Sequence, residues 1–437
     1  MASQATVPTP EKPLRVMLLS WEYPPVMVGG LGRHVHALAT SLAAAGHRVT
    51  VVTRHAAGAP LEELRDGVRI VRAPEDPPTF PLATPALLAW TMAFNHALTR
   101  AALHASATDA FDVIHAHDWL VTHTAVTMRD HLGVPLVATI HATEAGRHQG
   151  WLPGELNRCI HTVEWWLGHE ASRVVACSEY MRWEIGRLLE LPESNIEVIP
   201  NGVDAPVWRA TPSAVAAVRK RFAGDGPLIG FAGRLVYEKG VQHLVHAVPE
   251  LRDRHPGLRL VIAGDGPHRS ELQAEIGRLS LEPAVSFAGF VGDELPATFA
   301  ATDAVVVPSI YEPFGMVALE AAAAGAPLAV SHTGGLAEIV KPGVTGVTFP
   351  AKDPAALASA VSGLLADEAS ARAMARRARA MVARRYGWAS IAAQTAAVYR
   401  RTVATTPASR AEARARLATG RPTIVVPEGN LLATGQG

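Results

Sequence analysis

The sequence feature that most constrains the fold is one repeated order: a short apolar run rich in β-branched residues, a turn and a helical pattern. In the first half, the apolar runs lie at residues 15–20, 48–55, 111–116, 134–140, 172–178 and 195–201. Strands that alternate with helices in this way form a parallel sheet with helices on both faces. The first half therefore predicts an α/β unit.

The same order starts again after residues 201–204, with apolar runs at residues 227–233, 258–264, 284–289, 303–309 and 326–331. The chain has 437 residues, which is more than one hydrophobic core usually supports. We therefore predict an α/β protein with two doubly wound sheets, joined near residues 203–226 and facing one another across a cleft.

Composition narrows the functional classes. Hydrophobic residues make up 49% of the chain and charged residues 18%, which is typical of folded globular domains. Forty basic residues balance forty acidic ones, so no overall field attracts nucleic acid. Two cysteines form no disulfide framework, and no apolar run is long enough for a signal peptide or a membrane span. We expect a cytoplasmic protein without a nucleic-acid partner.

Two C-terminal segments differ from the rest. Residues 369–387 predict a basic amphipathic helix with Met374, Ala378 and Met381 on one face. Such a helix contacts either anionic lipid or the core of its own domain, and we favour packing on the domain. Residues 406–437 are expected to form a flexible tail.

Open α/β sheets bind ligands at the carboxyl ends of their strands. Gly29 and Gly30 follow the first predicted strand and precede a helix, where free amides bind anions. A turn with positive φ explains the two glycines equally well.

Asp118 and His141 follow two later strands of the first half, which indicates a cleft lined by polar side chains. His115 and His117 share one face of their strand and, with Asp118, offer ligands for a metal. His141 is the obvious candidate for a further ligand. We predict no metal site, and a contact between Asp118 and a sugar hydroxyl.

In the second half, Arg234 and Lys239 follow one strand and precede a helix. The arginine fork and the lysine point charge together suit the oxygens of a diphosphate. A solvated surface pair is the alternative interpretation.

Residues 311–320 (YEPFGMVALE) lead from a strand through a turn into a helix predicted over residues 314–325. The first amides of a helix lack intrahelical partners and can hold a phosphate; here they belong to Gly315, Met316 and Val317. Glu320, one turn into the helix, can accept both hydroxyls of a ribose, as an acidic residue does in dinucleotide folds. Glu312 would then contact the group beyond the phosphates, and the pattern predicts a nucleotide-sugar site.

The two glutamates with seven residues between them, the Arg234 and Lys239 pair and the Gly29–Gly30 loop resemble the retaining GT-B glycosyltransferases of family 4. The likeness runs from about residue 14 to about residue 400. The chain is similar to bacterial glycogen-synthase-type enzymes, including actinobacterial α-(1→4)-glucosyltransferases of glycogen or methylglucose lipopolysaccharide synthesis. It differs from many glycogen synthases because no lysine precedes the two glycines.

The resemblance implies two Rossmann-like domains. Residues 14–205 would bind the acceptor and residues 206–385 the nucleotide-sugar, with a helix at residues 386–400 crossing back to the first domain.

The resemblance also implies a role for each matching residue. Arg234 and Lys239 would neutralise the leaving diphosphate. Glu320 would bind the ribose and Glu312 the hydroxyls of the transferred sugar. His141 would lie at the donor sugar, with its carbonyl near the anomeric carbon, and Asp118 would help to place the sugar or the acceptor.

These roles predict transfer of glucose from ADP- or UDP-glucose to the non-reducing end of an α-1,4-glucan or maltooligosaccharide, without metal or other cofactor. Three alternatives stay open. The first is a mannosyl- or glucosyltransferase acting on a lipid or small-molecule acceptor, in which the arginine-rich helix contacts the membrane. The second is a metal hydrolase that uses His115, His117 and Asp118. The third is a sugar-binding protein without catalysis, although binding alone needs no clamp for a leaving group.

Overall fold

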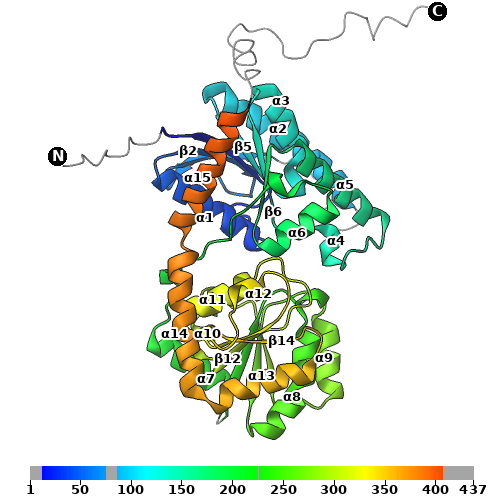
Figure 1. Ribbon diagram of the computed structural model, residues 1–437, viewed down its shortest axis with the longest axis vertical. Coiled ribbons are helices and arrows are strands. Elements are labelled where there is room, and N and C mark those ends of the chain that lie inside the picture. Colours follow the sequence, from blue (N-terminus) through cyan, green and yellow to red (C-terminus); the bar gives the residue numbers. More distant parts are fainter. Residues whose placement is uncertain (1–11, 75–85, 225, 407–437) are drawn as a thin grey trace, which may run out of the picture. The chain divides into compact units, whose positions relative to one another are not determined.

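The computed structural model describes residues 12–74, 86–224 and 226–406 (Figure 1). The tail predicted at residues 406–437 lies outside the described residues from residue 407 onwards. The described residues form two sheets, one on each side of residue 205 in the sequence.

By the density of its internal contacts, the chain divides into two units. Unit 1 takes in Met1–Thr139, Trp166–Val174 and Ala396–Gly437. Unit 2 takes in Ile140–Trp165 and Val175–Thr395. The domain boundaries expected from the sequence stay a prediction.

The first sheet has eight strands in the order β3-β4-β2-β1-β5-β6-β7-β8. Their bounds are β1 (Arg15–Ser20), β2 (Arg48–Arg54), β3 (Glu62–Arg65), β4 (Val68–Ala73), β5 (Val113–His117), β6 (Leu136–Ile140), β7 (Arg173–Ala176) and β8 (Ile196–Val198). The pairings from β4 to β6 are parallel, whereas β3 pairs with β4 in the antiparallel sense. β1 and β5 are buried, because helices cover both faces of a doubly wound sheet.

The helices that follow these strands are α1 (Gly30–Ala44), α2 (Leu87–Thr108), α3 (Thr122–Leu132), α4 (Glu144–Arg147), α5 (Glu155–Glu170) and α6 (Glu179–Leu188). α1 connects β1 to β2 and α2 connects β4 to β5, so the two connections run in opposite directions along the sheet. Right-handed crossovers then place α1 and α2 on opposite faces. The strand order reverses between β1 and β5, and such a switch point is where open sheets bind ligands.

The second sheet has six parallel strands in the order β11-β10-β9-β12-β13-β14. Their bounds are β9 (Leu228–Ala232), β10 (Arg259–Ala263), β11 (Val285–Gly289), β12 (Ala304–Val307), β13 (Leu328–Ser331) and β14 (Val347–Phe349). This is the strand order of a dinucleotide-binding fold, with its switch point between β9 and β12.

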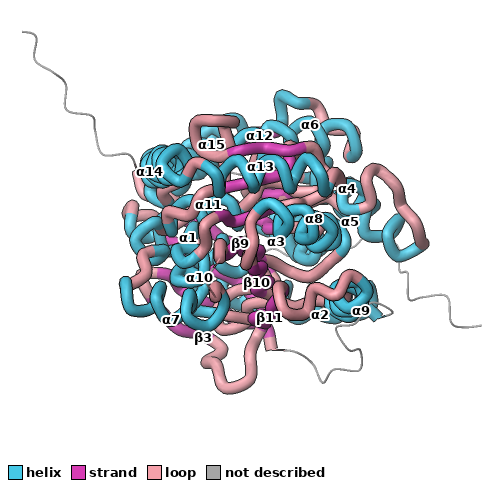
Figure 2. Tube along the Cα trace, turned by 90° about the horizontal axis from the view of Figure 1, so that it is seen from below, coloured by secondary structure: helices cyan, strands magenta, loops and turns pink. Residues whose placement is uncertain are grey.

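Helices cover both faces of this sheet. Their bounds are α7 (Pro212–Phe222), α8 (Val241–Arg254), α9 (Arg269–Arg278), α10 (Leu295–Ala301), α11 (Met316–Ala324), α12 (Leu336–Ile339), α13 (Pro354–Ala366) and α14 (Glu368–Arg385). α8 and α13 lie side by side over one core cluster, and α7 and α10 pack together over the other (Figure 2). The predicted basic helix forms as α14. Its apolar face, including Met374, Ala378 and Met381, is buried, which agrees with packing on its own domain.

The helix expected at residues 386–400 forms as α15 (Trp388–Thr405), and its Tyr399 is fully buried against β5. Within the described part of the chain, no helix combines the length and the apolar character needed to cross a bilayer.

Candidate functional site

The switch point of the second sheet brings together the loops that follow β9 and β12. Arg234 comes two residues after β9 and is exposed. The loop then forms a short 3₁₀ turn, Tyr237–Lys239, and enters α8 at Gly240. A Cβ added to Gly240 would lie 2.0 Å from the carbonyl oxygen of Pro308, so the two loops touch backbone to backbone. Only glycine allows this approach, since its φ is also +69°.

Lys239 and Glu312, which the sequence placed on these two loops, form an ion pair. The Lys239 Nζ donates to Oε2 of Glu312 at 2.8 Å, and the Ser309 hydroxyl donates to the same oxygen at 3.0 Å. Glu312 is buried. A charge-assisted hydrogen bond in a partly buried place fixes the orientation of both groups. The Ser309 contact was not expected from the sequence.

α11 begins directly after this loop, at Met316, two residues after the start expected from the sequence. Gly315 caps it with φ +117°, and a Cβ there would lie 2.7 Å from Cδ2 of Leu336. The first amides, including those of Met316 and Val317, donate to no side chain among the described residues. These amides and the helix dipole provide a place for an anion. Glu320 lies inside α11 and is buried.

At the switch point of the first sheet, Gly29 caps α1, and α1 begins with Gly30. Gly29 has φ −149°, and neither glycine has the positive φ that the alternative interpretation of this turn required. The amides of Val28 and Gly29 both donate to Oε2 of buried Glu22, each at 2.9 Å. In this conformation the chain's own carboxylate therefore holds the Gly29 amide, one of the two glycine amides expected to bind an anion. Sequence reasoning missed Glu22.

Asp118 follows β5 on the other side of the same switch point. Its φ of 61° and ψ of 173° belong to a region that is essentially restricted to glycine. Its amide donates to the Thr139 carbonyl at 3.0 Å. Such backbone strain costs roughly 1–3 kcal/mol and is concentrated at functional sites.

His115 has a structural environment. One ring nitrogen lies 2.6 Å from the Tyr399 hydroxyl and the other 2.7 Å from Thr139 Oγ1, so both are engaged. A metal site that needs His115 as a ligand would have to break one of these hydrogen bonds. His117 shares its strand face as expected, with the two ring centroids 4.2 Å apart.

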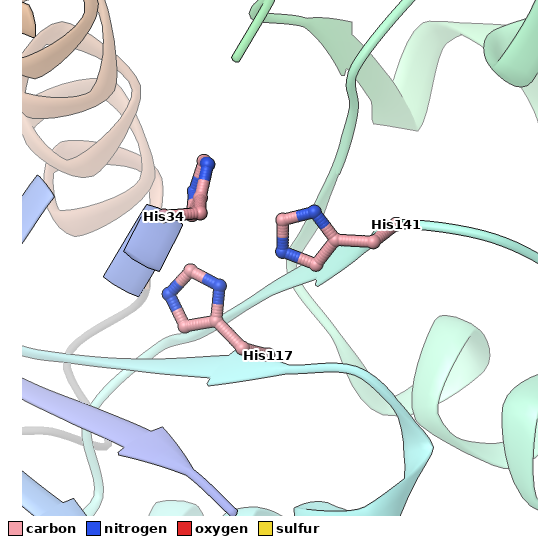
Figure 3. Close-up of side chains that lie close together, drawn as sticks. All are labelled: His34, His117 and His141. Carbon is pink, nitrogen blue, oxygen red and sulfur yellow. The ribbon is translucent and has the colours of Figure 1, made fainter. Parts of the chain in front are cut away.

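The ring of His117 also lies beside that of His34, with the centroids 5.5 Å apart (Figure 3). His141 follows β6, the neighbour of β5 in the sheet (Figure 3). Burial lowers the pKa of His141 to about 4, so its imidazole is neutral near pH 7.

Sequence profiles of two families match the chain. Glycosyltransferase Family 4 matches residues 28–206 and Glycosyl transferases group 1 matches residues 216–381. A glycogen synthase from Mycobacterium tuberculosis is 45% identical over 398 residues, which cover 88% of this chain and 94% of that protein. The chain belongs to the family 4 glycosyltransferases.

This family 4 enzyme has further relatives. An alpha-maltose-1-phosphate synthase from Mycolicibacterium smegmatis is 32% identical over 411 residues, covering 89% of this chain and 99% of that one. Among solved structures, a sucrose-phosphate synthase from Thermosynechococcus elongatus superposes with a TM-score of 0.78 at 26% identity, covering 90% of this chain and 99% of that one. The predicted family and GT-B fold class are confirmed, and the protein is a hexosyltransferase.

Proposed function

We propose that this family 4 enzyme transfers glucose from ADP- or UDP-glucose to the non-reducing end of an α-1,4-glucan, with retention at the anomeric carbon. The observation that carries the proposal is the Lys239–Glu312 pair at the start of α11, at the switch point of a dinucleotide-type sheet. The 45% identity to a glycogen synthase supports a glucan acceptor.

The donor nucleotide is assigned to the second sheet. Arg234, Lys239 and the first amides of α11 bind the diphosphate, and Glu320 accepts the ribose hydroxyls. The amides are those of Gly315, Met316 and Val317. Fixed charges and amides stabilise the leaving diphosphate without a metal, and each such group contributes about 10²–10³ in rate.

The transferred sugar is assigned to Glu312, His141 and Asp118. Glu312, oriented by Lys239, accepts from the sugar hydroxyls. His141 is neutral and offers its backbone carbonyl near the anomeric carbon. Asp118 helps to place the sugar or the acceptor.

In the reaction, the bond between the anomeric carbon and the diphosphate oxygen breaks as the acceptor hydroxyl attacks on the same face. The leaving phosphate takes the proton of that hydroxyl, so no protein nucleophile is required. The transition state resembles an oxocarbenium ion paired with the departing diphosphate. Trapping of a glycosyl-enzyme adduct would overturn this route.

A small-molecule acceptor is the second candidate. The 32% identity to an alpha-maltose-1-phosphate synthase along nearly the whole chain favours it. A lipid acceptor has less support, because the apolar face of α14 is buried and leaves no apolar stripe for a membrane.

The deciding experiment measures release of nucleoside diphosphate from ADP-glucose, UDP-glucose and GDP-mannose in the presence of EDTA. Each donor is tested alone and with glycogen, maltooligosaccharide or glucose 1-phosphate. We expect glucan-dependent release that collapses in Glu312→Ala and persists in Glu271→Ala, a glutamate on the exposed side of α9.

The anomeric configuration of the product, read by NMR, tests retention. Release from GDP-mannose alone would overturn the glucan assignment, and activity abolished by EDTA would overturn the metal-free mechanism. Release that depends only on glucose 1-phosphate would favour the second candidate.

A further inference from the structure

α6 carries a buried carboxylate that takes no part in the steps above. Glu184 is 3% exposed, and a carboxyl group in such a place needs hydrogen-bond donors. Two of its donors are hydroxyl groups, one from each of two loops that carry proposed site residues.

Both hydroxyls donate to the same oxygen of Glu184. Thr143 Oγ1 lies 2.6 Å from Oε1, and the Tyr311 hydroxyl lies 2.7 Å from it. The amide of Gly146 in turn donates to Thr143 Oγ1 at 3.0 Å. The hydrogen bonds therefore run from the Gly146 amide to the Thr143 hydroxyl and from that hydroxyl to Glu184. They end on the carboxylate, because a carboxylate oxygen can only accept.

The residues of this hydrogen-bond network are closely packed around Gly146. A Cβ added to Gly146 would lie 2.3 Å from Glu184 Oε1 and 2.5 Å from the Tyr311 hydroxyl oxygen. Burial, together with the negative charge of Glu184, raises the pKa of Tyr311 well above its usual value. The phenol therefore keeps its proton and remains a donor at neutral pH.

α6 has a second attachment to the loop that carries Tyr311. Ser178, the N-cap of α6, accepts from the Met181 amide and donates to the Pro313 carbonyl at 2.6 Å. Tyr311 and Pro313 flank Glu312, so α6 holds this residue's peptide from both sides. All of these residues belong to unit 2.

We propose that Glu184 is a positioning residue that sets the segment after β6, which carries His141, against the segment before α11, which carries Glu312. This inference rests on the proposed function, in which His141 and Glu312 contact the same donor sugar. Thr143 lies two residues after His141, and Tyr311 directly precedes Glu312. A shift at Glu184 therefore displaces both sugar contacts.

The first test compares Glu184→Gln with Glu179→Gln, a control on the same helix whose side chain is 57% exposed. In Glu184→Gln we expect kcat to fall about 10²-fold, the loss that follows from a displacement of about 1 Å. The donor KM should change much less, because the diphosphate contacts lie elsewhere. A kcat within twofold of the control would overturn the proposal.

Tyr311→Phe removes one hydroxyl that donates to Glu184 and keeps the carboxylate. This variant is the second test if Glu184→Gln folds poorly. The double variant Glu184→Gln/Tyr311→Phe should be no slower than the slower single variant, because both changes break one network. Independent, multiplying losses would contradict the proposal.

Hydrogen exchange gives a readout that needs no substrate. Amides of residues 143–146, 311 and 312 should exchange faster in Glu184→Gln than in Glu179→Gln, with Gly146 affected because its acceptor Thr143 is no longer held. Unchanged exchange would overturn the proposal even where turnover falls. A wild type that turns over no nucleotide-sugar, combined with the expected exchange, would overturn the proposed function and leave the structural role of Glu184 intact.

Discussion

The starts of α1 and α11 look alike in the sequence and differ in the structure. Each helix follows a switch-point strand, and each is capped by a glycine, Gly29 for α1 and Gly315 for α11. At α1 the amides of Val28 and Gly29 are held by the carboxylate of Glu22. At α11 no side chain of the described residues takes the first amides, and Lys239 pairs with the carboxylate of the preceding loop. The two helix starts therefore differ at the capping glycine, whose amide donates to the chain's own carboxylate at α1 and to no described side chain at α11.

The largest effect is expected from the cation next to α11. Lys239→Ala removes positive charge from the leaving diphosphate and leaves Glu312 buried without its ion-pair partner. We expect kcat/KM to fall about 10²–10³-fold. Lys220→Ala, on the surface of α7, is the matched control and should retain activity. A loss in kcat/KM below about tenfold would mean that Lys239 does not stabilise the leaving diphosphate.

Paired glycine substitutions test the comparison directly. Gly315→Ala forces a side chain into φ +117° and towards Leu336, so the free energy of unfolding should fall by roughly 1–3 kcal/mol. Gly29→Ala places its Cβ in open space at an ordinary extended φ and should cost less than about 1 kcal/mol. Urea denaturation measures both. Equal losses in the free energy of unfolding would contradict the difference in backbone strain between Gly315 and Gly29.

A smaller effect is expected at Glu22. Glu22→Gln replaces a charged acceptor of two amides by a neutral one, and we expect a loss of about 1 kcal/mol in the free energy of unfolding. Asp367→Asn, at the N-cap of α14, is the control because its carboxylate accepts from a single amide. A loss at Glu22 no larger than at Asp367 would show that the carboxylate does not fix the loop before α1.

The last prediction concerns pH. His141 has a pKa of about 4 in the folded protein, against about 6.5 for an ordinary histidine. The unfolded chain therefore binds more protons between these values. The stability contributed by neutral His141 is complete above about pH 6.5 and decreases as the pH falls towards 4.

This change is below about 1.4 kcal/mol per pH unit, because it involves less than one proton. Urea titrations of wild type and His141→Gln between about pH 4.5 and 7.5 should show a shallower slope in the variant. The other histidines contribute equally to both proteins. Parallel slopes would contradict the low pKa of His141.

The sequence was sufficient for most strands of the two sheets and for the residues at their switch points, whereas β3, β4 and β14 were not predicted. Apolar strands and glycine turns are local patterns, so the positions of Arg234, Lys239 and Glu312 at strand ends followed from them. The start of α11 at Met316 was predicted within two residues.

The contacts made by distant residues were not predictable. Glu184 is 41 residues from Thr143 and 127 from Tyr311, and no periodicity links them. His115 looked like a metal ligand because its partner Tyr399, 284 residues away, was not visible in the pattern. Glu22 lies close to Gly29, but its role depends on how the intervening loop folds back.

The strained backbone of Asp118 affects which residue evolution favours at this position. A left-handed conformation favours glycine, so Asp118→Gly would relieve strain at the end of β5. Selection for heat resistance alone would drive that replacement. If descendants of this chain keep an aspartate at this position, its carboxylate is under selection for function, because its backbone conformation alone favours glycine.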